Sequence, residues 1–166
     1  DSAQQQELDK QVSVTTLEEI DVQFIRHTGP YADAYKAWLH MLEHVGPRTL
    51  FSESCIKISL THDYPDITPA DKLRFDACIH TEKYFPKLNR QILKGGLYAT
   101  LANLGNLDSL DKTIDQLFRL WLPHSGYEPV NQPPYYHHKN LGRLLNFNNM
   151  TTIIHLPIQR IQRQAR

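Results

Sequence analysis

Hydrophobic and polar residues alternate at the start of the chain. The segments VSVTTL (12–17) and IDVQFI (20–25) both show this pattern, with Ile20, Val22 and Phe24 on one side of the second segment. Because successive side chains of a strand point to opposite faces, a period of two predicts β-strands with one buried side. The chain is therefore expected to begin with two strands.

The pattern changes to helical spacing after residue 30. Apolar positions recur every three or four residues until a Gly-Pro pair at 46 and 47: Ala34, Trp38, Met41 and Val45. Such a stripe is typical of an amphipathic helix, and glycine followed by proline commonly ends one. Alternation returns in ESCIKISLTHD (53–63) and LRFDACIH (73–80), on either side of a proline-containing loop. The first half predicts the order strand, helix, strand, strand.

The second half repeats this order. GGLYATLANLG (95–105) is expected to be a strand, apolar residues at helical spacing follow from 107 to 121, and PYYHHK (134–139) and TTIIHLPI (151–158) supply two more strands. Superposing Gly29 on Gly105, an offset of 105 − 29 = 76, places Trp38 on Ile114. Two copies of one supersecondary unit explain this agreement.

We therefore predict an α+β fold, a tandem pseudo-symmetric repeat of strand-helix-strand-strand modules with antiparallel sheets, two main helices and a central cleft. The predicted organisation is a polar linker or tail at 1–10, one domain at 11–160 made of module one (11–86) and module two (87–160), and a basic tail at 161–166. Each sheet would have one face under its helix and one face free, so pairing two modules would leave a ligand-sized cleft between them.

The composition excludes several classes of protein. Hydrophobic residues make up 40% of the 166 residues, and the 18 Lys and Arg balance the 18 Asp and Glu, so no basic field covers the domain for DNA or anionic lipid. No apolar run is long enough to span a bilayer, so we expect no membrane contact and a cytoplasmic location. The polar head without an initial Met is what we expect of a fragment cut from a longer protein at a linker, and removal of a tag or leader would give the same start. Cys55 and Cys78 are expected to be reduced core residues.

One motif resembles a zinc site. His40, Glu43 and His44 have the spacing HxxEH. At about 100° per residue, however, both histidines fall on the side of the helix opposite Trp38, which is the buried side. We therefore predict that they face water, and we predict neither a metal nor another cofactor.

Candidate ligand contacts come mainly from aromatic residues that carry a polar tip. Rigid rings provide contact area at a small entropic cost, and five of them flank turns or strand ends: Tyr31, Tyr64, Tyr98, Trp121 and Tyr136. Trp38, Phe75 and Phe118 sit at periodic positions and are expected to belong to the core.

Two polar residues join the candidates. His138 is adjacent to His137 in a predicted strand, so the two rings point to opposite faces and only a single-residue ligand role is open to His138. Asp76 lies on the face opposite Phe75, and it is either a carboxylate within the cleft or the ion-pair partner of Arg74.

The chain resembles the gyrase-inhibitor-like (GyrI-like) small-molecule-binding domains, including the C-terminal effector-binding domains of AraC-type bacterial transcription regulators. The resemblance extends from about residue 12 to residue 159. It rests on the order and spacing of these segments: RHTGPY (26–31) followed by Trp38, DYPDITPADKLRFDACI (63–79), GGLYAT (95–100), Gly105, WLPHSGYEP (121–129) and HLPI (155–158). It implies two modules around a cleft that accepts small, often hydrophobic or cationic molecules.

The chain departs from the family at one position. Many members carry a glutamate in a segment like PxFExY, and its negative charge pairs with the positive charge of the ligand. In the corresponding segment PPYYHHKN (133–140), Tyr136 stands in its place, and Asn103 stands where a histidine is frequent. A cation over a tyrosine ring gains only about 0.5 to 2 kcal/mol, so we expect a neutral or weakly polar effector, or a weaker site.

The resemblance implies a ligand-sensing domain of a bacterial transcription regulator. It would bind a small hydrophobic or aromatic effector and reach DNA only through a DNA-binding domain outside this chain; a homodimer is left open. The alternatives are a stand-alone gyrase-inhibitor-like protein-interaction module and, from the resemblance alone, a small-molecule hydrolase. The sequence contains no GxSxG, Walker-type or dinucleotide-binding motif, so we predict no catalytic residues.

Overall fold

The computed structural model describes residues 2–105, 107–140 and 150–162. The first half contains these elements: α1 (Ser2–Gln11), β1 (Ser13–Leu17), β2 (Ile20–Thr28), the 3₁₀ turn η1 (Tyr31–Asp33), α2 (Tyr35–Val45), α3 (Pro47–Leu50), β3 (Ile56–Thr61), η2 (Ala70–Lys72) and β4 (Arg74–His80). The predicted strands and main helix of this half are confirmed.

The second half contains β5 (Asn89–Leu93), β6 (Gly96–Gly105), α4 (Leu107–Gln116), the π-helical turn η3 (Leu117–Trp121), α5 (Leu122–Ser125), β7 (Tyr127–Pro129), β8 (Tyr135–His138) and β9 (Met150–Arg160). The predicted strands and helix are again confirmed. The α+β class and the antiparallel pairing agree with the prediction.

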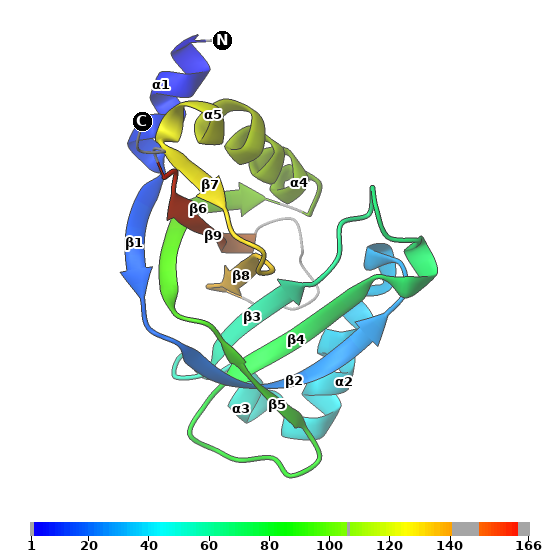
Figure 1. Ribbon diagram of the computed structural model, residues 1–166. Coiled ribbons are helices and arrows are strands. Elements are labelled where there is room, and N and C mark those ends of the chain that lie inside the picture. Colours follow the sequence, from blue (N-terminus) through cyan, green and yellow to red (C-terminus); the bar gives the residue numbers. More distant parts are fainter. Residues whose placement is uncertain (1, 106, 141–149, 163–166) are drawn as a thin grey trace.

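The two modules exchange their first strands. Along the described residues the sheet runs β1-β6-β9-β8-β3-β4-β2-β5, and β7 pairs with the end of β9. Strand β1 pairs with β6 and strand β5 pairs with β2 in one continuous register, since Ser13 faces Thr100 and Phe24 faces Asn89. Figure 1 shows the resulting pair of long strands running from one half of the molecule to the other.

The repeat extends over the whole module. Shifting β1, Ser13–Leu17, by 76 gives residues 89–93, the range of β5. The glycines at the end of the second strand of each module also agree, because Gly29 has φ 141° and Gly105 has φ 133°. These angles lie in a region that residues with a Cβ rarely adopt, so both turns into the helix favour glycine.

Three buried clusters form the core. Trp38 and Met41 belong to the first, between α2 and its strands. Leu117 and Trp121 of η3 belong to the second, together with residues of β6 and β9. The third joins the faces of the sheet that carry no helix, and it draws residues from both modules, including Val22, Ile58 and Tyr135. The helix-free faces are thus closed against each other, because the sheet curls.

Some segments of the chain form elements that were not predicted. Residues 2–11 form a helix where a polar tail was predicted, because Leu8 is buried in the second cluster and anchors one side of it. Strands β5 and β7 were not predicted. Residues 163–166, most of the predicted basic tail, lie outside the described part of the chain.

The predicted burial or exposure of several side chains is confirmed. Trp38 and Phe75 are buried core residues, and both cysteines are buried. His40 and His44 are exposed, as their position on the helix indicated. No helix in the described ranges is both long and apolar enough to cross a membrane.

Candidate ligand-binding cleft

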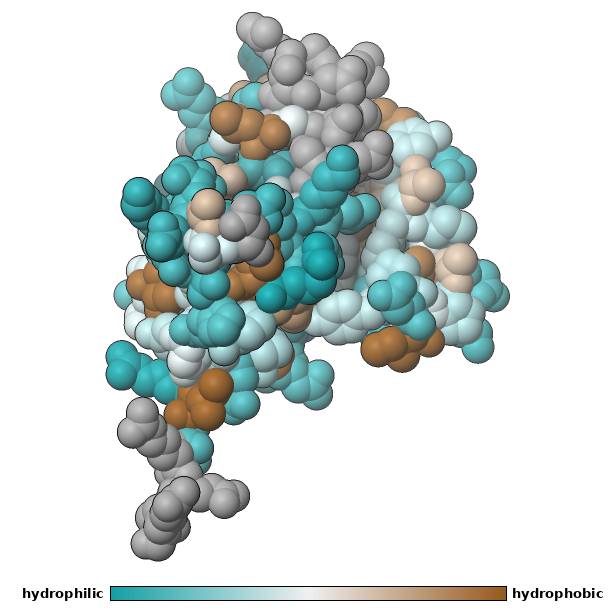
Figure 2. Space-filling view, turned by 90° about the horizontal axis from the view of Figure 1, so that it is seen from above, coloured by the Kyte–Doolittle hydropathy of each residue, from teal (hydrophilic) through white to brown (hydrophobic). Residues whose placement is uncertain are grey.

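A large cleft lies between the two main helices. Its volume is about 880 Å³, a size suited to a small organic ligand. Figure 2 shows a mainly hydrophilic surface in which separate hydrophobic patches appear and a hollow separates two lobes. Residues from both halves line the cleft: Tyr31, Ala32, Ala34, Tyr35, Trp38, Ser59, Thr61, His62, Asp63, Tyr64, Pro65, Phe75, Leu110, Asp111, Ile114, Phe118, Val130, Asn131, Gln132, Pro133, Pro134, Tyr136 and His138.

The walls are apolar and pseudo-symmetric. Trp38 of α2 and Ile114 of α4, which the offset of 76 relates, both line the cleft. Phe75 and Phe118 add aromatic surface, so three residues predicted as core also form the wall. Apolar walls of this kind bind the hydrophobic body of a ligand by removing it from water.

One part of the floor carries a linear chain of hydrogen bonds. Trp38 Nε1 donates to Ser59 Oγ at 3.2 Å, and Ser59 Oγ lies 2.6 Å from His138 Nε2. His138 Nδ1 lies 3.2 Å from Thr152 Oγ1. Burial, together with a smaller effect of the neighbouring His137, lowers the pKa of His138 to about 3. The ring is therefore neutral near pH 7, with one nitrogen donating and the other accepting.

The other part of the floor holds Tyr136 and Thr61. Tyr136 is buried, and its hydroxyl is 3.4 Å from Thr61 Oγ1. Burial raises the pKa of Tyr136 to about 12, so the phenol keeps its proton at neutral pH. The floor therefore presents neutral hydroxyl and imidazole groups.

Two carboxylates, those of Asp63 and Asp111, belong to the lining of the cleft. Tyr31 fastens the loop after β3 to the start of α2, because its hydroxyl donates to the carbonyl oxygen of Asp63 at 2.8 Å. Asp63 in turn forms an ion pair with Arg74, and Asp111 lies on the opposite helix. Among the described residues that line the cleft, none is Lys or Arg. This described part of the lining therefore offers no direct Lys or Arg partner to an anionic ligand.

Four of the seven candidate residues line the cleft: Tyr31, Tyr64, Tyr136 and His138. Their part in binding remains a prediction. Asp76 lies on the other face of β4, where its fully buried carboxylate accepts hydrogen bonds from Arg26, His62 and Gln91. Its cross-strand partner is Arg26, and the expected alternative, Arg74, pairs with Asp63 instead.

Tyr98 and Trp121 also lie outside the cleft lining. The Tyr98 hydroxyl donates to the carbonyl oxygen of Lys94 at 2.6 Å, and its ring belongs to the third cluster. Trp121 is buried in the second cluster and stacks on Tyr127 with the ring centroids 6.0 Å apart. The polar group of Tyr98 and the ring of Trp121 thus have their partners within the protein and do not face the cleft.

The sequence analysis missed Ser59, Thr61 and Tyr35. The two hydroxyl residues are two of the three polar positions of the alternating segment 56–61, and they could have been found by asking what the polar face of that strand contacts. The cleft lies on the side of the sheet that carries the helices, not on the free faces.

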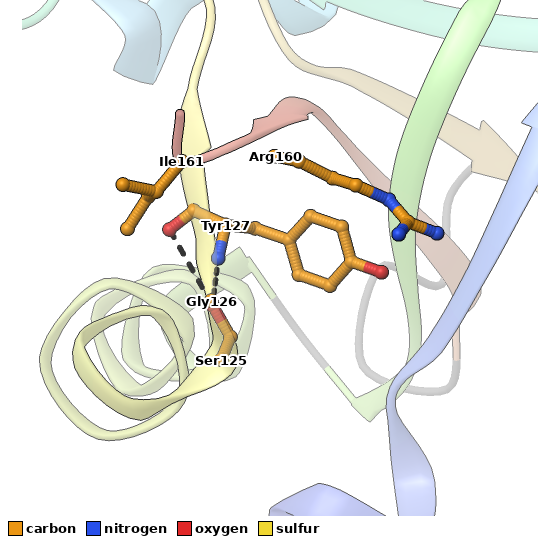
Figure 3. A pocket seen from close by; sticks show the side chains of 5 residues that line it. All are labelled: Ser125, Gly126, Tyr127, Arg160 and Ile161. Carbon is orange, nitrogen blue, oxygen red and sulfur yellow. Dashed lines mark hydrogen bonds between the residues drawn. The ribbon is translucent and has the colours of Figure 1, made fainter. Parts of the chain in front are cut away.

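A smaller depression lies where β7 meets the end of β9. Figure 3 shows its five lining residues, Ser125, Gly126, Tyr127, Arg160 and Ile161. The hydroxyl of Ser125 donates to the Leu122 carbonyl at 2.8 Å and accepts from the Tyr127 amide at 3.0 Å. These groups serve to end the helix, so the large cleft is the better candidate site.

The fold and the cleft define a small-molecule-binding domain built from two modules. Residues 10–159 match the GyrI-like small molecule binding domain, and the chain belongs to this family. The resemblance found in the sequence is confirmed.

Relatives with similar sequences are named as transcription regulators. The chain is 30% identical over 100 residues to the probable transcriptional regulator YgiV of Escherichia coli O157:H7, and the match covers 58% of this chain and 62% of that protein. It is 29% identical over 100 residues to YgiV of Escherichia coli strain K12, with the same coverage. None of the relatives named here is described as an AraC-type regulator.

Solved structures share the fold. The EcmrR C-terminal domain matches 91% of this chain and 98% of its own with a TM-score of 0.70 at 16% identity. EcmrR in its DNA complex matches 96% of this chain and 63% of its own, also with a TM-score of 0.70, at 15% identity. SAV2435 bound to tetraphenylphosphonium gives 0.61 at 9% identity, covering 89% of this chain and 93% of its own. A protein of Listeria innocua described as a hydrolase gives 0.62 at 9% identity, covering 93% and 98%.

Proposed function

We propose that this chain is the ligand-sensing domain of a bacterial transcription regulator, and that it binds a small hydrophobic or aromatic molecule in the cleft. The observation that carries the proposal is the cleft itself, which has apolar walls from both modules over a floor of neutral polar groups. This arrangement suits a ligand with a large apolar body and few charges.

The cleft also supports a mechanism for sensing. A ligand between α2 and α4 contacts both modules, since Trp38 and Ile114 stand on opposite helices. A ligand shifts a regulator only by the difference between its affinities for two conformations. A ligand that contacts both modules stabilises the arrangement of the helices that fits it.

DNA would be bound by a part of the regulator outside this chain. EcmrR has been solved in a complex with DNA, and the part similar to this chain is 63% of it. YgiV is named a probable transcriptional regulator and is matched over 62% of its length. A regulator of this kind would act in the cytoplasm.

The residues of the floor argue against general acid-base catalysis. A side chain that transfers protons efficiently at neutral pH has a pKa near 7. Tyr136, at the position of the family's glutamate, has its pKa raised to about 12 by burial, and burial lowers that of His138 to about 3. We therefore do not extend the hydrolase description of the Listeria protein to this chain.

A thermal-shift panel tests the proposal. The panel would contain neutral aromatic ketones and hydrocarbons together with tetraphenylphosphonium, the compound found in a structural neighbour. A ligand present at ten times its dissociation constant should raise the melting temperature by about 3–6 °C. Leu110→Trp, which fills the cleft from α4, should abolish the shift.

Leu39→Trp is the matched control, because Leu39 is 38% exposed on α2 and does not line the cleft. It should preserve the shift. Equal shifts in both variants, or no shift with any compound, would contradict the proposed function.

A further inference from the structure

Two hydroxyl contacts cross the junction between β3 and β8, and they are pseudo-symmetric. Ser59 and Tyr136 face each other in the ladder. The hydroxyl of Ser59 contacts His138, which follows Tyr136 by two residues on β8, at 2.6 Å. The hydroxyl of Tyr136 contacts Thr61, which follows Ser59 by two residues on β3, at 3.4 Å. The two contacts thus occupy equivalent places in the two modules, yet their lengths differ.

The short contact belongs to a completed network. Trp38 donates its indole N–H to Ser59, and Thr152 lies within hydrogen-bond distance of the second nitrogen of His138. Trp38 also packs its ring edge to face with His138, with the ring centroids 5.9 Å apart. This half of the floor uses its hydrogen-bonding groups within the protein.

The long contact lacks such support. The residue equivalent to Trp38 is Ile114, whose side chain has no N–H to donate. Hydroxyl-to-hydroxyl hydrogen bonds are usually about 2.5–3.0 Å long, so 3.4 Å is a weak contact. The hydroxyls of Thr61 and Tyr136 carry one proton each, and their mutual contact uses one of the two. Among the described residues no other hydrogen bond involves either hydroxyl, so the second proton can be donated to a ligand.

We propose that the hydroxyls of Tyr136 and Thr61 form an anchor for a neutral hydrogen-bond acceptor, such as a ketone or amide oxygen, on an otherwise aromatic ligand. This inference rests on the proposed function and names the ligand class of the same cleft. A carboxylate fits less well, because Asp63 and Asp111 line the rim and the described lining contains no Lys or Arg.

The position of the anchor connects recognition to the junction of the modules. Thr61 ends β3 of the first module and Tyr136 lies on β8 of the second. An acceptor oxygen bound by both would replace one long contact across the junction with two shorter hydrogen bonds. Ligands with and without the acceptor would therefore differ in how strongly they hold the two modules together.

A matched pair of probes tests the anchor. Benzophenone carries a carbonyl between two phenyl rings, and diphenylmethane carries a methylene group in the same place. Dissociation constants would be measured by NMR titration for the wild type, for Tyr136→Phe and for Thr61→Val. The control is Tyr135→Phe, the same substitution at the next residue, which is buried in the third cluster on the other face of the sheet.

The wild type and Tyr135→Phe should bind benzophenone about 3- to 10-fold more tightly than diphenylmethane, the gain of one good neutral hydrogen bond. Tyr136→Phe and Thr61→Val should each reduce this ratio towards one. Equal affinities in the wild type would refute the anchor and leave the proposed function standing. Binding of neither probe in the cleft would overturn both.

Discussion

Replacing Asp76 with asparagine should destabilise the protein more than the same substitution at an exposed aspartate. The Asp76 carboxylate is fully buried, and it accepts hydrogen bonds from Arg26 at 2.7 Å, His62 at 2.7 Å and Gln91 at 2.9 Å. Burial alone would raise the pKa of Asp76, but these hydrogen bonds outweigh it and lower the pKa to about 2.

The magnitude follows from this pKa. Lowering it from 3.8 to about 2 corresponds to about 2 kcal/mol of stability near pH 7. Breaking a fully buried ion pair costs about 3–5 kcal/mol. We expect Asp76→Asn to cost about 2 kcal/mol, less than this range, because its partners can reach water when the carboxylate is lost. The side chain of Arg26 is 38% exposed and that of His62 is 16% exposed.

The pH dependence has a definite sign. The folded-state pKa is below the unfolded one, so the unfolded state binds the proton first, and the stabilisation present above pH 3.8 disappears as the pH falls through about 2. The difference between wild type and Asp76→Asn should thus fall to about half at pH 3. Taking this difference removes the contributions of the other titrating groups.

Urea unfolding followed by tryptophan fluorescence measures this difference, because Trp38 and Trp121 are both buried. The control is Asp21→Asn. Its partner is Arg90, and the two side chains are 52% and 54% exposed, so its loss should cost less than about 1 kcal/mol. The reasoning would be refuted if Asp76→Asn were no more destabilising than the control, or if its effect were undiminished at pH 3.

Two further predictions concern the crossing strands and the pH range. Gly95→Ala should lower stability by about 1–3 kcal/mol, because a Cβ there would lie 2.8 Å from both Glu19 N and Leu17 O; an unchanged melting temperature would contradict this. Burial lowers the pKa of both His137 and His155 to about 4, so the unfolded state takes up protons first and stability should fall by about 1 kcal/mol for each between pH 7.5 and 5.5. A melting temperature that stays constant or rises over this range would contradict it, and His155→Gln should make the dependence shallower.

The repeat was the strongest signal in the sequence, and it contained more than was taken from it. The offset of 76 was read from glycines and helix positions, yet it also maps β1 onto β5. NRQIL (89–93) does not alternate clearly, so its own pattern did not reveal the strand. Its pairing with β2 comes from the exchange between modules, which no local pattern encodes.

The side of the sheet that forms the cleft could not be read from the sequence. A period of two shows that Phe75 and Asp76 point to opposite faces, but it does not show which face meets the ligand. The curled sheet closes its free faces around a third cluster that contains Tyr98, and Asp76 lies on the same side. The cleft instead lies between the helices, and Tyr136 and His138 are among the residues that line it.

The central claim is that the cleft between α2 and α4 binds a small molecule. An NMR titration of the isotope-labelled protein, with a compound that raises its melting temperature, tests this claim most directly. We predict saturable shifts of the amide signals of residues that line the cleft, among them Trp38, Thr61, Ile114 and Tyr136. Shifts confined to other surfaces, such as the depression around Tyr127 and Arg160, would contradict the account.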